Sequence, residues 1–241
     1  MYERRLHEVL QRIDNAAGDA GRPAPRLLAV SKRHSATAVA ELAAAWARMQ
    51  PQAIVALGEN YVQEAVAKQS ELNGQPALPA IEWHLIGHLQ SNKAREAASA
   101  FDWVQTVDRP RLVDALARHR PADRPPLNVL LQVNIDDESS KHGCAPDAVA
   151  GLTAAVAAQP ALRLRGLMAI PTPHDDVEHR RPAFARMHAL FDELRAAHPS
   201  VDTLSMGMSD DFELAIAEGA TMVRIGTALF GPRPGQHGGD T

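Results

Sequence analysis

The chain has 241 residues, 45% of them hydrophobic, so it can bury one sizeable core. Its 25 Lys and Arg against 29 Asp and Glu give a formal net charge of −4, which argues against nonspecific nucleic-acid binding. No apolar run approaches the roughly 18 residues of a membrane span, and the charged start does not resemble a signal peptide. The single cysteine, Cys144, cannot form an internal disulfide, so we expect a cytoplasmic protein.

An amphipathic helix at residues 2–17 and a Gly/Pro-rich break precede short apolar runs that alternate with longer helical segments. The runs predict strands at residues 26–31, 54–57, 81–86, 103–107, 128–135, 162–169, 203–206 and 222–225. Eight strand-helix units predict a single-domain (β/α)8 TIM barrel over residues 1–231, with an extra N-terminal helix and a disordered tail at 232–241. A doubly wound sheet is the alternative, although no GxGxxG follows the first strand.

Lysine is rare in this chain. Of the 25 basic residues only four are lysines, namely Lys32, Lys68, Lys93 and Lys141. Lys32 ends the first strand, so its side chain is expected at the C-terminal mouth of the barrel, where barrel active sites lie. That environment can lower the pKa of an amine and make it a nucleophile. The alternative is an ordinary solvated lysine at a strand end.

Small and hydroxyl residues follow the seventh and eighth strands, where barrels commonly bind phosphate. The candidates for such a site are Ser205, Ser209, Gly226 and Thr227. Ordinary helix capping is the competing interpretation: Ser209 or Asp210 is then the N-cap of a helix that starts near Asp210, and Glu213 completes a capping box. Because carboxylates repel phosphate, we expect Asp210 and Asp211 to turn outward.

Three further positions carry polar groups at strand ends. Arg224 lies inside the apolar strand TMVRIG and needs an acceptor, either a carboxylate of the protein or a ring nitrogen or anion of a ligand. Asn60 follows the second strand and either contacts a ligand or caps a helix that begins at Tyr61. His84 and His88 flank a strand end, where their spacing does not place two imidazoles on one face, so we predict no metal site.

Several segments together resemble one protein family. They are LLAVSK (27–32), LGENYVQEA (57–65), WHLIGHLQSNKA (83–94), LLQVNIDDESSKHG (130–143), LRGLMAIP (164–171) and LSMGMSDDFELAIAEGATMVRIGTALFG (204–231). The family is that of the pyridoxal phosphate homeostasis proteins, whose barrel is similar to the N-terminal domain of alanine racemase. The chain departs from the family pattern in a minor way at Arg33, His34 and His88.

The resemblance implies that Lys32 forms an internal aldimine with pyridoxal 5′-phosphate (PLP). It also implies that Ser205, Ser209, Gly226 and Thr227 surround the phosphate, that Arg224 approaches the pyridine nitrogen, and that Asn60 lies near the cofactor. The predicted function is then PLP binding in the intracellular homeostasis of PLP (vitamin B6), with apo PLP-dependent enzymes as candidate partners and a monomeric state.

Catalysis is not expected to be efficient. Arginine stays protonated, so a ring nitrogen that faces Arg224 accepts a hydrogen bond and remains a weak electron sink. The second domain that completes the site of racemases is not found in this sequence. One alternative is a PLP-dependent amino-acid racemase; another is a barrel enzyme that acts on a phosphorylated metabolite through Lys32 without a cofactor.

Overall fold

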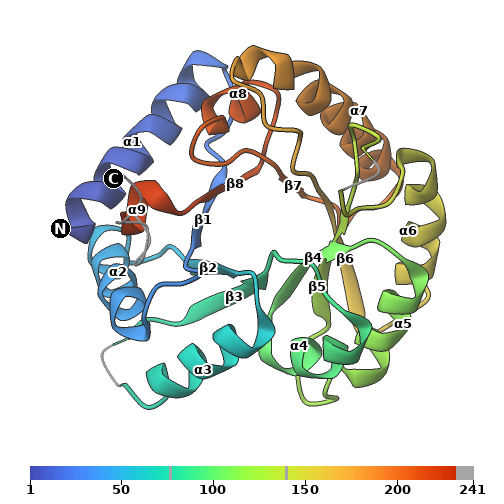
Figure 1. Ribbon diagram of the computed structural model, residues 1–241, viewed down its shortest axis with the longest axis horizontal. Coiled ribbons are helices and arrows are strands. Elements are labelled where there is room, and N and C mark those ends of the chain that lie inside the picture. The colour runs from blue at the N-terminus through green and yellow to red at the C-terminus, as the bar shows by residue number, and fades with distance from the viewer. Residues whose placement is uncertain (76–77, 139–140, 232–241) are drawn as a thin grey trace, which may run out of the picture.

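The computed structural model describes residues 1–75, 78–138 and 141–231. Eight parallel strands close into a barrel in sequence order, with β8 paired to β1 (Figure 1). The strands are β1 Arg26–Val30, β2 Val55–Glu59, β3 Ile81–Leu85, β4 Trp103–Val107, β5 Leu127–Gln132, β6 Leu162–Met168, β7 Thr203–Ser205 and β8 Met222–Ile225. This closed order confirms the predicted (β/α)8 barrel and excludes the doubly wound sheet. The predicted disordered tail, residues 232–241, lies outside the described residues.

Helices form a ring around the barrel, as Figure 1 shows. They are α1 Tyr2–Asp19, α2 Ala36–Met49, α3 Val62–Leu72, α4 Ala94–Ala100, α5 Pro110–His119, α6 Val149–Ala157, α7 Arg181–Ala197, α8 Phe212–Ala217 and α9 Thr227–Phe230. The predicted extra N-terminal helix is α1, which buries Leu6, Val9, Ile13 and Ala17. These residues recur three or four positions apart, and the resulting apolar stripe packs α1 beside α2, α8 and α9. No helix in the described part of the chain is long and apolar enough to cross a membrane.

Two predicted strands differ from the observed ones by two or more residues at one end. Strand β2 continues to Glu59, because Gly58 and Glu59 are buried and pair with β3. Strand β5 ends at Gln132, three residues earlier than predicted. The apolar residues beyond it, Val133 and Ile135, are buried in the outer core between strands and helices, which is why the sequence pattern runs past the end of the strand.

The inside of the barrel is unusually polar. Large apolar side chains fill the space between strands and helices, whereas the interior holds two small apolar groups, one of Leu28, Ala56 and Met222 and one of Trp103, Leu130 and Met168. Between them lie the buried polar side chains His84, Gln105, Ser205 and Arg224. Barrel interiors are normally packed with branched apolar residues, so these polar groups need a structural or functional account.

Candidate cofactor pocket at the barrel mouth

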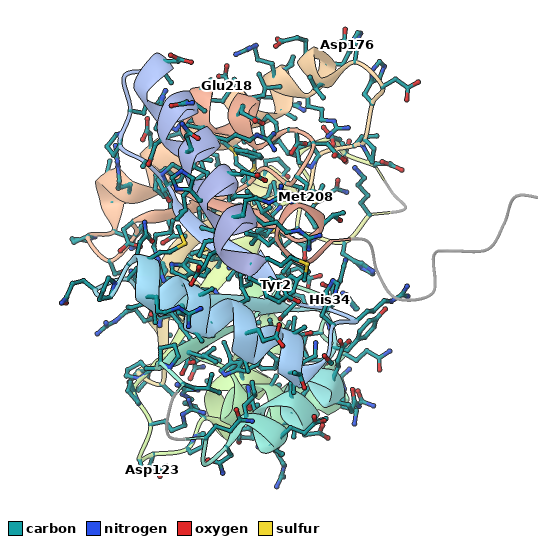
Figure 2. All side chains as sticks on the ribbon, turned by 90° about the vertical axis from the view of Figure 1, so that its left-hand side faces the viewer. Tyr2, His34, Asp123, Asp176, Met208 and Glu218 are labelled. Carbon is teal, nitrogen blue, oxygen red and sulfur yellow. The ribbon has the colours of Figure 1, made fainter. Side chains whose placement is uncertain are left out.

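A cavity of about 140 Å³ opens at the C-terminal ends of the strands. Its lining comprises Val30, Lys32, His34, Asn60, Ile86, Ile170, Met208, Ser209, Arg224, Gly226 and Thr227. Six of the seven predicted site residues therefore line one cavity, and Ser205 is the exception. Figure 2 shows His34 and Met208 toward one end of the barrel and Asp123, in the loop before β5, at the other.

Lys32 lies in a tight turn directly after β1. The His34 N–H donates to the Ser31 carbonyl at 3.1 Å, and Arg33 adopts a left-handed conformation with φ of 65°. The Arg33 N–H also donates to the Glu64 carboxylate of α3. Both sides of Lys32 are thus tied to the body of the protein, so the turn presents its side chain to the cavity from a fixed backbone.

A buried ion cluster holds this turn in place through contacts with Ser31. The Lys68 Nζ donates to the Ser31 carbonyl at 2.7 Å, to Glu59 at 2.6 Å and to Glu64 at 2.8 Å, and the Ser31 hydroxyl also donates to Glu59. Burial raises the pKa of Glu59 despite these bonds. Because three acceptors engage its ammonium group, Lys68 is part of the support of the Lys32 turn and faces no ligand. Sequence reasoning missed this cluster, although the i,i+4 spacing of Glu64 and Lys68 was a visible sign.

The loop after β7 is shaped by Gly207 and Asp211. Gly207 has φ of 90°, and a Cβ there would lie 2.6 Å from the Ala215 Cβ, so only glycine fits. Asp211 accepts from the Met208 N–H at 2.6 Å and from the Arg180 guanidinium at 2.6 Å. Asp210 is exposed, but the expectation that Asp211 also turns outward is wrong: its buried carboxylate is neutralised by Arg180 and holds the loop.

The capping interpretation of this loop is also wrong. Helix α8 begins at Phe212, Asp211 stands at its N-cap without a side-chain capping bond, and Glu213 pairs with Arg12 of α1. The hydroxyls of Ser209 and Thr227 make no hydrogen bond within the described part of the chain, although both line the cavity. Two uncommitted hydroxyls on neighbouring loops are suited to bind an anion.

Gly226 lies between these loops and β1. A Cβ at this position would come within 3.3 Å of the Val30 carbonyl oxygen, so the close approach of the two strand ends favours glycine. This approach leaves the Gly226–Thr227 backbone accessible in the cavity wall.

Arg224 is buried in β8 and contacts no carboxylate among the described residues. Its Nη1 donates to the Ser205 hydroxyl at 2.8 Å and its Nη2 to the Ala169 carbonyl at 2.8 Å. Burial lowers the pKa of this guanidinium to about 10, so it stays protonated at neutral pH. Ser205 does not line the cavity, contrary to the phosphate-site expectation, because its fully buried hydroxyl is used by Arg224 and by Gln105.

Asn60 does not cap a helix. Helix α3 begins at Val62 and has Tyr61 at its N-cap, without a side-chain capping bond. The Asn60 Oδ1 is buried in the cavity wall and has no partner within the described residues. Gly87 packs so closely on the Asn60 carbonyl that a Cβ would lie 2.1 Å from its oxygen, which holds Asn60 in place. An unpaired buried polar atom in a pocket wall indicates a ligand contact.

The comparisons with known proteins agree with this geometry. The profile of the family described as alanine racemase, N-terminal domain, matches residues 5–234. A pyridoxal phosphate homeostasis protein from Pseudomonas aeruginosa is 52% identical over 230 residues, which are 95% of this chain and 94% of that protein. The chain belongs to the pyridoxal phosphate homeostasis protein family. Its resemblance to that family, stated from the sequence segments, is thereby confirmed.

Solved structures of a similar protein, a member of the COG0325 family, extend the comparison. PipY from Synechococcus elongatus is described with PLP bound, has 35% sequence identity and a TM-score of 0.80, and is matched over 96% of this chain and 100% of that one. The same protein without PLP gives 36% identity and a TM-score of 0.81.

Three other residues that the sequence singles out, His84, His88 and Cys144, do not line the pocket. His88 stacks on His142 with ring centroids 3.8 Å apart, whereas His84 points into the barrel interior, so the two imidazoles of the WHLIGH segment do not converge. Burial raises the pKa of Cys144 to about 11, so this thiol is not activated. His34, which sequence reasoning placed only at the pocket edge, contributes to the cavity lining.

Proposed function

We propose that this protein binds PLP in the mouth cavity, covalently through the Nζ of Lys32, and takes part in the homeostasis of this cofactor. The observation that carries the proposal is the convergence of Lys32, two uncommitted hydroxyls and Arg224 on one cavity. Membership of the family supports it, as does the PLP reported in PipY.

The residues present fit the chemical groups of PLP. The Lys32 Nζ would hold the cofactor covalently at its aldehyde carbon, with the release of one water molecule. The hydroxyls of Ser209 and Thr227 and the backbone at Gly226 hold the phosphate, and the orphan amide of Asn60 contacts the ring edge. Arg224 donates to the pyridine nitrogen. When bound, PLP supplies an electron sink for chemistry at the α-carbon of an amino acid.

The positive charge of Arg224 also supports the proposal that the protein holds PLP without efficient catalysis. Its guanidinium is protonated at neutral pH and can only donate, so the ring nitrogen beside it must accept. An unprotonated pyridine withdraws electrons weakly, which disfavours carbanion formation. His34 in the cavity lining keeps a racemase as the second candidate, because an imidazole near Lys32 can exchange protons. Exchange of the α-proton of amino acids in deuterated water measures that activity.

The proposed attachment is tested by borohydride reduction of the PLP-loaded protein followed by peptide mapping. We expect the reduced adduct on the Lys32 peptide, its loss in Lys32→Ala, and its retention in Lys93→Ala. Lys93 is a matched control because it is partly exposed and pairs with Glu96 on the surface. An adduct on Lys68, Lys93 or Lys141 instead would overturn the assignment, and failure to take up PLP at all would favour an enzyme for a phosphorylated metabolite.

The proposed role in homeostasis is tested by transfer. PLP-loaded protein is mixed with an apo PLP-dependent enzyme, and the recovered activity of that enzyme is followed. We expect recovery from the loaded protein and none after borohydride has fixed PLP to Lys32. If the unreduced protein also fails to restore activity, apo-enzymes are not its partners. Sedimentation of the loaded protein tests the expected monomeric state.

A further inference from the structure

A continuous chain of side-chain hydrogen bonds crosses the interior of the barrel. It runs from Arg224 to Ser205 (2.8 Å), Gln105 (2.7 Å), His84 (3.0 Å) and Glu82 (2.8 Å), and Glu82 is joined at its far side by Arg26 (2.6 Å). The four inner members, Arg224 to His84, are all at most 3% exposed. Arg224 lines the mouth cavity, whereas Arg26 lines a cavity of about 390 Å³ at the opposite end of the strands. The chain therefore links the proposed cofactor site to the far end of the barrel.

The direction of the first bonds follows from Arg224. A guanidinium has donors and no acceptor, so the Ser205 oxygen must accept from it. Ser205 has a single hydroxyl hydrogen, which it donates to the Gln105 Oε1. The amide of Gln105 is thereby oriented with its oxygen toward Ser205 and its NH2 group toward His84.

The remaining bonds continue in the same direction. The Gln105 Nε2 donates to the His84 Nδ1 and, at 3.2 Å, to the Met222 Sδ, so both of its hydrogens are used. Since Nδ1 accepts, the hydrogen of a neutral imidazole is on Nε2, which donates to Glu82. Burial lowers the pKa of His84 and keeps the ring neutral. Ser205, Gln105 and His84 are thus each both donor and acceptor, and each has one orientation.

The chain ends on a charge. Burial opposes ionisation of Glu82, but the hydrogen bond from His84 and the hydrogen bond and positive charge of Arg26 lower its pKa. This carboxylate is the acceptor at the end of the chain, whereas Arg224 contacts no carboxylate among the described residues. Reversal of the chain would leave Arg224 facing a hydroxyl hydrogen and Glu82 facing a lone pair, and both arrangements are repulsive.

We propose that Glu82, His84 and Gln105 are positioning residues that, through Ser205, hold Arg224 as a hydrogen-bond donor to an unprotonated ring nitrogen of the bound cofactor. This inference rests on the proposed PLP site and adds a rule for ligand specificity. The pocket prefers an aromatic ring that has a hydrogen-bond acceptor at the ring atom facing Arg224. The side chains that connect Arg224 to Glu82 are uncharged, so the positive charge of Arg224 is not cancelled by a neighbouring carboxylate. The N–H groups of Arg224 that the protein does not use can therefore donate to the ligand. The far carboxylate sets the direction without approaching the cavity.

The test compares PLP with deazapyridoxal phosphate, in which C–H replaces the ring nitrogen. The dissociation constants of both are measured for the wild type and for Glu82→Gln. We expect the wild type to prefer PLP by about tenfold or more, as for a hydrogen bond from a charged donor. In Glu82→Gln we expect this preference to shrink severalfold and the visible spectrum of bound PLP to shift, although residue 82 is four hydrogen bonds away from Arg224.

Asp202→Asn is the matched control. Asp202 is also a carboxylate at the far end of the barrel, where it pairs with Arg165 at 2.5 Å beside the same cavity. It does not belong to the series of hydrogen bonds that leads to Arg224. We expect this variant to keep the wild-type preference for PLP. If Glu82→Gln does not fold, Ser205→Ala breaks the chain next to Arg224. Thr203→Val then removes a buried hydroxyl of the same strand, β7, as its control.

The outcomes separate this inference from the proposed function. Equal preference for PLP in the wild type, Glu82→Gln and Ser205→Ala overturns the positioning role, while the Lys32 adduct stays intact. A wild type that binds both ligands equally overturns the ring-nitrogen contact itself. Absence of any Lys32 adduct, with either ligand, overturns the proposed function instead.

Discussion

Two buried cations flank the mouth cavity and are stabilised in opposite ways. On the β1–β2 side, Lys68 is surrounded by two carboxylates and a carbonyl at 2.6–2.8 Å. On the β8 side, Arg224 is held by a hydroxyl and a carbonyl at 2.8 Å, and the carboxylate of its chain, Glu82, lies three links beyond Ser205. The first cation is neutralised where it stands, whereas the second keeps its charge directed at the cavity.

The two arrangements suit two different tasks, holding the backbone in place and recognising a ligand. A neutralised ion cluster fixes backbone, and here it fixes the turn that carries Lys32. A cation held only by neutral groups still attracts an acceptor, so it can recognise a ligand. This contrast predicts that substitutions on the Lys68 side mainly change stability, whereas substitutions on the Arg224 side mainly change ligand binding.

The largest effect is expected for Lys68→Met. Removal of this ammonium leaves Glu59 and Glu64 without their buried counter-ion, which costs about 3–5 kcal/mol of unfolding free energy. Urea denaturation measures the loss. The double variant Lys68→Met/Glu59→Gln recovers part of it, because the fully buried charge is gone as well. A loss no greater than that of Lys93→Met at the surface would show that the ion cluster does not support the fold.

Arg224→Gln tests the other side of the comparison. The variant loses the charge but keeps an amide that can donate to Ser205 or Ala169, so we expect a folded protein by circular dichroism. PLP retention should fall by about tenfold or more and the visible spectrum should shift. Arg224→Glu, which favours a protonated ring, should shift the spectrum further and raise α-proton exchange. An unchanged spectrum and affinity in both variants would mean that Arg224 does not touch the ring.

Ser209→Asp tests the proposed contact between Ser209 and the phosphate of the cofactor. Ser209 caps no helix, so the change should leave stability nearly unaltered, whereas a carboxylate beside the phosphate should weaken PLP retention by about tenfold. Ser209→Asn has the same size without the charge and serves as the control in equilibrium dialysis. Unchanged affinity in the Asp variant would remove Ser209 from the phosphate site.

The smallest effect concerns pH and the neutral imidazole of the Arg224 chain. Burial lowers the pKa of His84, so below about pH 6.5 the unfolded state takes up a proton that the folded state does not. Stability from this residue is therefore present above that pH and is lost as the pH falls. We expect the unfolding free energy of His84→Gln to fall less steeply between pH 7 and pH 5, by up to about 1.4 kcal/mol per unit. His7→Gln on exposed α1 is the control, and equal slopes in all three proteins would contradict a neutral His84.

Much of the cavity was predictable because strand ends in a parallel barrel share one rim. Once Lys32, Asn60, Ser209 and Gly226 are known to follow strands, their convergence needs no tertiary information. The capping predictions for Ser209 and Asp210 failed because the loop before α8 is held by the Asp211 carboxylate, whose partner Arg180 is 31 positions away. No local pattern announces such a partner.

The sequence by itself determined the eight strand-helix units and the residues that follow the strands, since apolar alternation and strand ends are local properties of the chain. The order of the strands, and with it the closed barrel, was decided by the tertiary structure. Only the tertiary structure decided which polar residues point inward and meet. Ser205 and Gln105 are 100 positions apart, and their hydrogen bond places Ser205 in the barrel interior, outside the lining of the mouth cavity. Arg224 fixes the direction of that bond, because a guanidinium can only donate and the Ser205 oxygen must accept from it. Whether a buried hydroxyl or amide donates or accepts is decided by its partners, and these are brought together only in the folded protein.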